Sequence, residues 1–181
     1  MTPQEIREKI LDVVGQNGGH LSSSLGAVEI ALALAETFDP LKDRVVWDVG
    51  HQAYAWKILT GRNDAFDSLR QLGGISGFPK PCESVHDAFI AGHASNSVAV
   101  ALGMAQARTM QEEDYKVLAL IGDGALTGGL AYEGLSNAGE CKQQLLVILN
   151  DNGMSITPSV GGVAKHLARQ RLRPQYLRGK A

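Results

Sequence analysis

Apolar positions fall into two patterns along this chain, a helical repeat and short continuous runs. The helical repeat spans residues 4–14 and returns between Leu25 and Ala35, where each stretch presents one apolar face. Ser24 precedes the second stretch and is a suitable N-cap. A third helix is expected over residues 53–59, and the many small residues of 94–107 suit a helix packed closely against a sheet.

Continuous apolar runs cover residues 117–121 and 145–149, and they are typical of parallel strands covered on both faces. A shorter run over residues 44–48 predicts another strand. Residues 126–139 lie between the two long runs and predict a crossover helix, which completes a right-handed βαβ unit. The chain is therefore expected to form an α/β domain with a largely parallel sheet and helices on both faces.

Composition narrows the class of protein. The 181 residues suggest one domain, and 44% hydrophobic with 20% charged residues is ordinary for a folded soluble protein. A net charge of -2 gives no sign of nucleic acid or an anionic membrane as partner. No apolar run nears the roughly 20 residues of a membrane span. The amino terminus lacks targeting features, and two cysteines make no disulfide framework, so a reducing cytoplasm is expected.

Two polar turns follow the long apolar runs. Gly122-Asp123-Gly124 ends the first and Asn150-Asp151-Asn152 ends the second. Ligands of open α/β sheets bind where the carboxyl ends of strands converge, and glycines let backbone N–H groups approach a phosphate. Asp123 and Asn152 could then give oxygen ligands to Mg²⁺. The alternative is two tight turns whose polar residues cap helices.

Three histidines, His20, His51 and His93, each follow a glycine. A histidine on a glycine loop is exposed and positioned for acid–base work. Each could instead be a solvated or capping residue.

Residues 72–93 form a long stretch with weak periodicity. A loop of this length in a compact domain usually has a function. It could be a lid, a lining of the substrate site or a subunit contact, and the sequence does not distinguish these roles.

Taken together, these motifs resemble the thiamine-diphosphate signature of transketolase-like enzymes. The segments that match most specifically are 18–26, 47–54, 57–62 and 122–129, and they are similar to the 1-deoxy-D-xylulose-5-phosphate synthase family rather than to transketolase proper. The resemblance extends from about Ile6 to Tyr176.

The resemblance implies roles for individual residues. Asp123 and Asn152 match Mg²⁺ ligands, with a backbone carbonyl from Met154. His20 matches a histidine on the substrate side of the thiazolium, and with His51 it forms the expected catalytic pair. Many family members have serine at Ala94, so a hydroxyl contact would be lost there. The positions that match contacts to thiamine diphosphate are His51, Gly92, His93, Ala94, Gly124, Ala125 and Asn152.

The family reaction condenses pyruvate with D-glyceraldehyde 3-phosphate and releases CO₂, for isoprenoid, thiamine and pyridoxal precursor synthesis. The resemblance implies a cytoplasmic transferase that uses thiamine diphosphate and Mg²⁺ and works as a homodimer or with a partner chain.

Family members also continue through a pyrimidine-binding and a carboxyl-terminal domain that nothing here matches. Residues 1–181 are therefore expected to be an amino-terminal diphosphate-binding domain, incomplete at its carboxyl end and inactive alone. Two alternatives are a subunit of a split transketolase acting on another sugar phosphate and a non-catalytic cofactor-binding fragment.

Overall fold

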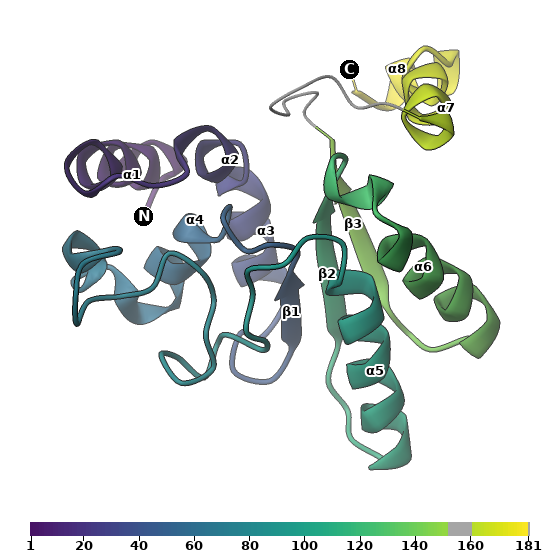
Figure 1. The fold of residues 1–181 in the computed structure, drawn as a ribbon, viewed down its shortest axis with the longest axis horizontal. Helices are drawn as coiled ribbons and strands as arrows, with labels where there is room; N and C mark the ends of the chain where they lie inside the picture. Colours follow the sequence, from purple (N-terminus) through teal and green to yellow (C-terminus); the bar gives the residue numbers. More distant parts are fainter. Residues whose placement is uncertain (152–160, 181) are drawn as a thin grey trace.

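The computed structural model describes residues 1–151 and 161–180, and its centre is a three-stranded parallel sheet (Figure 1). The strands are β1 (Arg44–Trp47), β2 (Val117–Gly122) and β3 (Leu146–Asn150), in the order β1-β2-β3. β2 pairs with both neighbours, with Val46 opposite Ala119 and Leu120 opposite Ile148. The predicted α/β fold with a parallel sheet is confirmed.

The helices lie on both sides of this sheet, with α1, α3 and α4 on one side and α5 and α6 on the other (Figure 1). No helix within the described residues is both long and apolar enough to cross a membrane. The helical elements are α1 (Pro3–Asn17), α2 (Leu21–Leu25), α3 (Val28–Thr37), α4 (Tyr54–Lys57), the turns η1 (Ile58–Arg62) and η2 (Phe66–Ser68), α5 (Ser97–Met110), the turn η3 (Ala125–Thr127), α6 (Gly129–Cys141), α7 (Gly162–Arg171) and α8 (Pro174–Lys180).

The burial of strand β2 on both faces explains why its sequence is apolar without interruption. Leu118 and Leu120 belong to the core beneath α1, α3 and α4, whereas Ala119 and Ile121 belong to the core beneath α5 and α6. Successive side chains of a strand point to opposite faces, so a strand covered on both sides needs apolar residues at every position. All four side chains are at most 1% exposed.

The prediction that Ser24 caps one helix over Leu25 to Ala35 is wrong. The chain forms α2 and α3 separately, with Gly26 and Ala27 between them, and Ala27 caps α3 without a side-chain hydrogen bond. The Ser24 hydroxyl instead donates to the carbonyl of His51 at 2.9 Å. A long-range contact therefore uses the hydroxyl that the sequence pattern assigned to a local cap, because this buried side chain lies against the turn after β1.

Candidate functional site

The turns that follow β1 and β2 and the end of β3 are joined at one edge of the sheet. The N–H of Asp48, after β1, donates to Leu120 at 2.8 Å, and the N–H of Asp123, after β2, donates to the carbonyl of Asn150 at 3.2 Å. The N–H of Val49 donates to the carbonyl of His93 at 3.3 Å. The carboxyl ends of the parallel strands thus bring together segments that are far apart in sequence, as open α/β sheets do.

Asp48 holds this edge together, and sequence reasoning missed it. Its carboxylate is 1% exposed and accepts the N–H groups of Ser95 at 2.7 Å and Ser97 at 3.0 Å. The Ser95 hydroxyl donates to the carbonyl of Ala125 at 2.7 Å. A carboxylate that accepts backbone N–H groups makes stronger hydrogen bonds than a neutral acceptor. Asp48 thereby links the segment after His93 to the turn after β2.

His20 and His51 lie together, as a pair contributed by two different turns. Their ring centroids are 5.3 Å apart and the ring planes meet at 71°. His20 immediately precedes α2, and its backbone N–H donates to the Tyr54 hydroxyl at 3.3 Å. His51 follows a turn in which Val49 has φ 58° and Gly50 has φ 82°. That left-handed turn reverses the chain after β1 and aims His51 at His20.

The surroundings of both histidines favour the neutral imidazole. Burial lowers the pKa of His20 below its ordinary value of 6.5, and the positive charge of Arg70 lowers it further. Burial also lowers the pKa of His51, His20 adds to that effect, and Asp48 opposes it. The Nδ1 atoms of His20 and His51 are buried and have no hydrogen-bond partner within the described residues. Two neutral imidazoles with an unused ring nitrogen each can accept or donate a proton.

The remaining predicted residues divide into three groups. Gly92, His93 and Ala94 are exposed, on the segment that Asp48 holds. Asp123 and Ala125 are half-buried and Gly124 is exposed, on the turn after β2. A Cβ added at Gly92 or Gly124 would meet no atom within 4 Å, so their backbone faces open space. The predicted ligands Asn152 and Met154 lie outside the described residues.

Comparison of the sequence with known protein families identifies the family that has this arrangement. The family model described as 1-deoxy-D-xylulose-5-phosphate synthase matches residues 2–181. The chain belongs to the 1-deoxy-D-xylulose-5-phosphate synthase family.

Members of the synthase family from several bacteria are highly similar to this chain. The 1-deoxy-D-xylulose-5-phosphate synthase of Carboxydothermus hydrogenoformans is 56% identical over 177 residues, which is 98% of this chain and 28% of the relative. A synthase of Geobacter metallireducens is 60% identical over 165 residues, which is 91% of this chain and 26% of the relative. The chain therefore spans about a quarter of the length of the curated relatives it matches.

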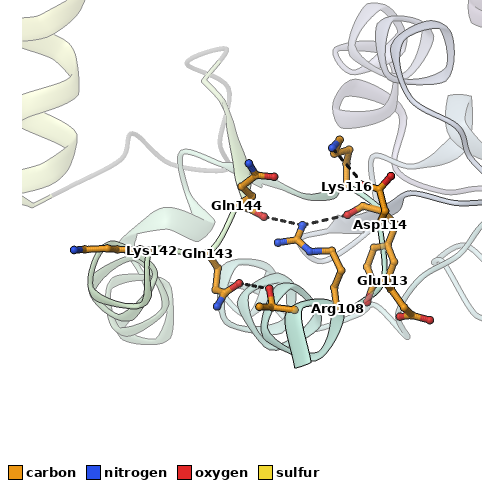
Figure 2. Close-up of a pocket in the computed structure, with 9 residues that line it drawn as sticks. Arg108, Glu113, Asp114, Lys116, Lys142, Gln143 and Gln144 are labelled. Atoms are coloured by element: carbon orange, nitrogen blue, oxygen red, sulfur yellow. Dashed lines mark hydrogen bonds and ion pairs between the residues drawn. The ribbon is translucent and has the colours of Figure 1, made fainter. Parts of the chain in front are cut away.

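A hollow of about 360 Å³ lies at the opposite edge of the sheet from these synthase-family motifs. Figure 2 shows the side chains that line it. Arg108 extends into it, and its Nη1 donates to the carbonyls of Tyr115 and Gln144, both at 3.1 Å. These two residues stand just before β2 and β3. The guanidinium therefore ties together the starts of two strands, and none of the predicted site residues that the structure describes lines the hollow.

Proposed function

We propose that this chain supplies the diphosphate- and Mg²⁺-binding half of the active site of a 1-deoxy-D-xylulose-5-phosphate synthase. The reaction is the condensation of pyruvate with D-glyceraldehyde 3-phosphate, with release of CO₂. The observation that carries the proposal is that, in a chain of this family, the His20–His51 pair and the Asp123 turn occur at the same edge of the sheet.

The residues at this edge fit thiamine diphosphate and Mg²⁺. Open space in front of Gly92 and Gly124 leaves backbone accessible to a diphosphate, and Asp123 brings a carboxylate of the kind that Mg²⁺ prefers. The unpartnered Nδ1 of His51 is a buried polar atom that a bound group would satisfy. In this proposal Asn152 and the carbonyl of Met154 complete the metal site. The residues proposed to contact the cofactor are His51, Gly92, His93, Ala94, Gly124, Ala125 and Asn152.

Bound thiamine diphosphate supplies the carbon nucleophile and the electron sink for decarboxylation. The protein's part is to anchor the diphosphate and to handle protons. His20 and His51 suit the second task because burial lowers their pKa values and so favours the neutral imidazole, which can accept a proton. Of the two, His20 is proposed to serve the reacting centre, and His51 to contact the cofactor as well.

The complete enzyme is proposed to need more than these 181 residues. The relatives are about three and a half times as long as this chain. In this proposal the pyrimidine-binding and carboxyl-terminal domains come from a longer chain or a partner, in a cytoplasmic homodimer without nucleic acid or membrane. The isolated 181-residue chain is then expected to lack turnover, because half of the cofactor has no surface to bind. Turnover of pyruvate and D-glyceraldehyde 3-phosphate by the rigorously purified chain would contradict this.

The decisive experiment compares His20→Ala with Asp123→Ala in the assembled enzyme. His20→Ala should reduce turnover by about 10²–10⁴-fold and leave the affinity for Mg²⁺–thiamine diphosphate nearly unchanged. Asp123→Ala should weaken cofactor binding steeply, as measured by calorimetry, because the metal loses a charged ligand. Asp114→Ala, at an exposed carboxylate near the far edge of the sheet, is the matched control.

The proposed division of roles fails if both variants change turnover and cofactor affinity in the same way. It also fails if His20→Ala mainly weakens cofactor binding and Asp123→Ala mainly lowers turnover. A role for His20 as a turn cap predicts a third pattern, namely a lower melting temperature with small and unselective kinetic changes.

A further inference from the structure

Four charged side chains are buried together where α4 and η1 meet the long segment 72–93. Arg62 binds Asp87 through two parallel hydrogen bonds of 2.7 and 2.9 Å, and it reaches Glu83 at 3.0 Å. Lys57 binds Glu83 and lies 3.8 Å from Asp87. The side chains are between 0% and 15% exposed. Two cations and two carboxylates balance in this buried ion cluster (Lys57, Arg62, Glu83 and Asp87), as burial of charge requires.

The two carboxylates of the buried ion cluster also hold the backbone on either side of a short turn. Glu83 accepts the N–H of Ser76 at 2.6 Å, and Asp87 accepts the N–H of Lys80 at 2.8 Å. Between these anchors lie Gly77, Phe78 and Pro79. Charge-assisted bonds at both ends fix the position of this anchored turn (residues 76–80) in a segment that has no helix or strand.

The anchored turn packs against both histidine-bearing turns of the site. The half-exposed Phe78 ring lies 5.9 Å from the His20 ring, centroid to centroid. Pro79 is buried against the backbone of Gly50, where an added Cβ would lie 2.5 Å from the proline Cδ. The turn is therefore fitted to the site on one side and fixed to the buried ion cluster on the other.

We propose that Phe78 is a positioning residue for His20, held in place by the buried ion cluster. The phenyl ring restricts the orientation of the imidazole and keeps water from one side of it. Segment 72–93 is then a fixed wall of the site rather than a lid, because its turn is anchored through buried charges. The kinetic consequence of this inference rests on the proposed role of His20 in the reaction.

The groups around His20 allow the effect of Phe78 to be isolated. Among the described residues, the titratable and charged groups that face His20 are Arg70 and His51, and the Tyr54 hydroxyl accepts the backbone N–H of His20. Burial is the largest cause of the lowered pKa of His20. Removal of the phenyl ring admits water while Arg70 and His51 stay in place. The pKa of His20 should therefore rise towards 6.5. The acidic limb of the pH–rate profile should then shift to higher pH.

The test uses Phe78→Ala, Phe78→Leu and the control Val85→Ala in the assembled enzyme. Val85 belongs to the same segment and is 72% exposed. Titration of the His20 ring by NMR, assigned with His20→Gln, should show a raised pKa in Phe78→Ala, and kcat should fall about 10- to 100-fold with cofactor affinity unchanged. Phe78→Leu, which restores an apolar side chain, should recover most of both effects. Val85→Ala should leave both at the wild-type values.

An unchanged pKa of His20 in Phe78→Ala would overturn the inference. So would a lower melting temperature accompanied by joint changes in kcat and KM that Phe78→Leu does not reverse. The NMR titration needs no turnover. A failure of the proposed function therefore leaves the titration result intact, whereas a failure of this inference appears in the titration itself.

Discussion

The two outer strands of the sheet differ in how completely they are covered. In β1, Val45, Val46 and Trp47 are at most 3% exposed, because helices α1, α3 and α4 pack on one face and α5 on the other. In β3, Leu146 is 46% exposed and the remaining residues are half-buried. The site divides in the same way. The histidine pair stands beside β1 and is fixed by packing, whereas the Asp123 turn stands beside the more open β3.

This contrast indicates that the proton-handling half of the site is preorganised by the chain's own interior. The segment 72–93 and the Ser24 hydroxyl pack on the turn that carries His51, and the Asp48 carboxylate ties the same turn to Ser95 and Ser97. The contacts described around Asp123 include its backbone hydrogen bond to Asn150 and the link from Ser95 to Ala125. Mutations should therefore cost more stability on the β1 side than on the β3 side.

The largest effect is expected at Asp87. Asp87→Asn removes one of the two buried carboxylates and leaves Lys57 and Arg62 with Glu83 alone, so the free energy of unfolding should fall by about 3–5 kcal/mol. Asp67→Asn breaks a surface pair with Lys9, where Asp67 is 70% exposed, and should cost less than about 1 kcal/mol. Urea unfolding of both variants measures the difference. Equal costs would mean that the buried ion cluster does not stabilise the fold.

Two leucines on neighbouring strands test the contrast in burial directly. Leu120→Ala in β2 removes a side chain that is 0% exposed and should cost about 2–5 kcal/mol. Leu146→Ala in β3 removes one that is 46% exposed, and it should cost less than half as much. Denaturant unfolding with an unchanged m-value provides the comparison. If Leu146→Ala proved as costly as Leu120→Ala, β3 would be as well covered as the centre of the sheet.

Asp48 should give an effect of intermediate size. Asp48→Asn replaces a carboxylate that accepts two buried N–H groups with an amide that carries one acceptor oxygen, so about 1.5–3 kcal/mol of stability should be lost. Hydrogen exchange at Ser95 and Ser97 should accelerate in the variant. Asp114→Asn, at an 85% exposed side chain, is the control and should change stability by less than about 0.5 kcal/mol. Slow exchange retained at both amides would refute the role of Asp48.

The smallest effect concerns pH. Because the folded-state pKa of His51 lies below 6.5, the unfolded chain binds more protons than the folded one as the pH falls below 6.5. Stability should therefore be full above pH 6.5 and decline on acidification towards the folded-state pKa. His51→Gln should flatten this decline, whereas His166→Gln, at an exposed residue, should leave its slope unchanged. A steeper decline in His51→Gln would reverse the sign of the assigned shift.

The sequence predicted most of the sheet because burial on two faces leaves a direct trace in composition. Residues 117–121 and 145–149 are apolar throughout, and they became β2 and most of β3. The glycine context of His20 and His51 marked both residues, but their 5.3 Å proximity depends on how the turns pack. Asp48 escaped notice because an aspartate after a short strand looks like an ordinary turn residue.

The buried ion cluster could not be predicted either. Its partners are 21 to 30 positions apart, and a charged residue in a long loop is most often solvated. The same limitation left the purpose of segment 72–93 open at the sequence level. Its role as a fixed wall becomes visible only when Glu83 and Asp87 are seen to hold the backbone at Ser76 and Lys80.

The parallel pairing of β1 with β2 also has a consequence for how the chain folds. Asp43, just before β1, accepts a hydrogen bond from Lys116, just before β2, and the two residues are 73 positions apart. The buried ion cluster closes much shorter loops, which cost less chain entropy. The wall beside the histidines can therefore order early as a local unit, whereas registry between β1 and β2 must wait for a slow long-range search. During that interval the strand edges stay unpaired, and low protein concentration should favour refolding over aggregation.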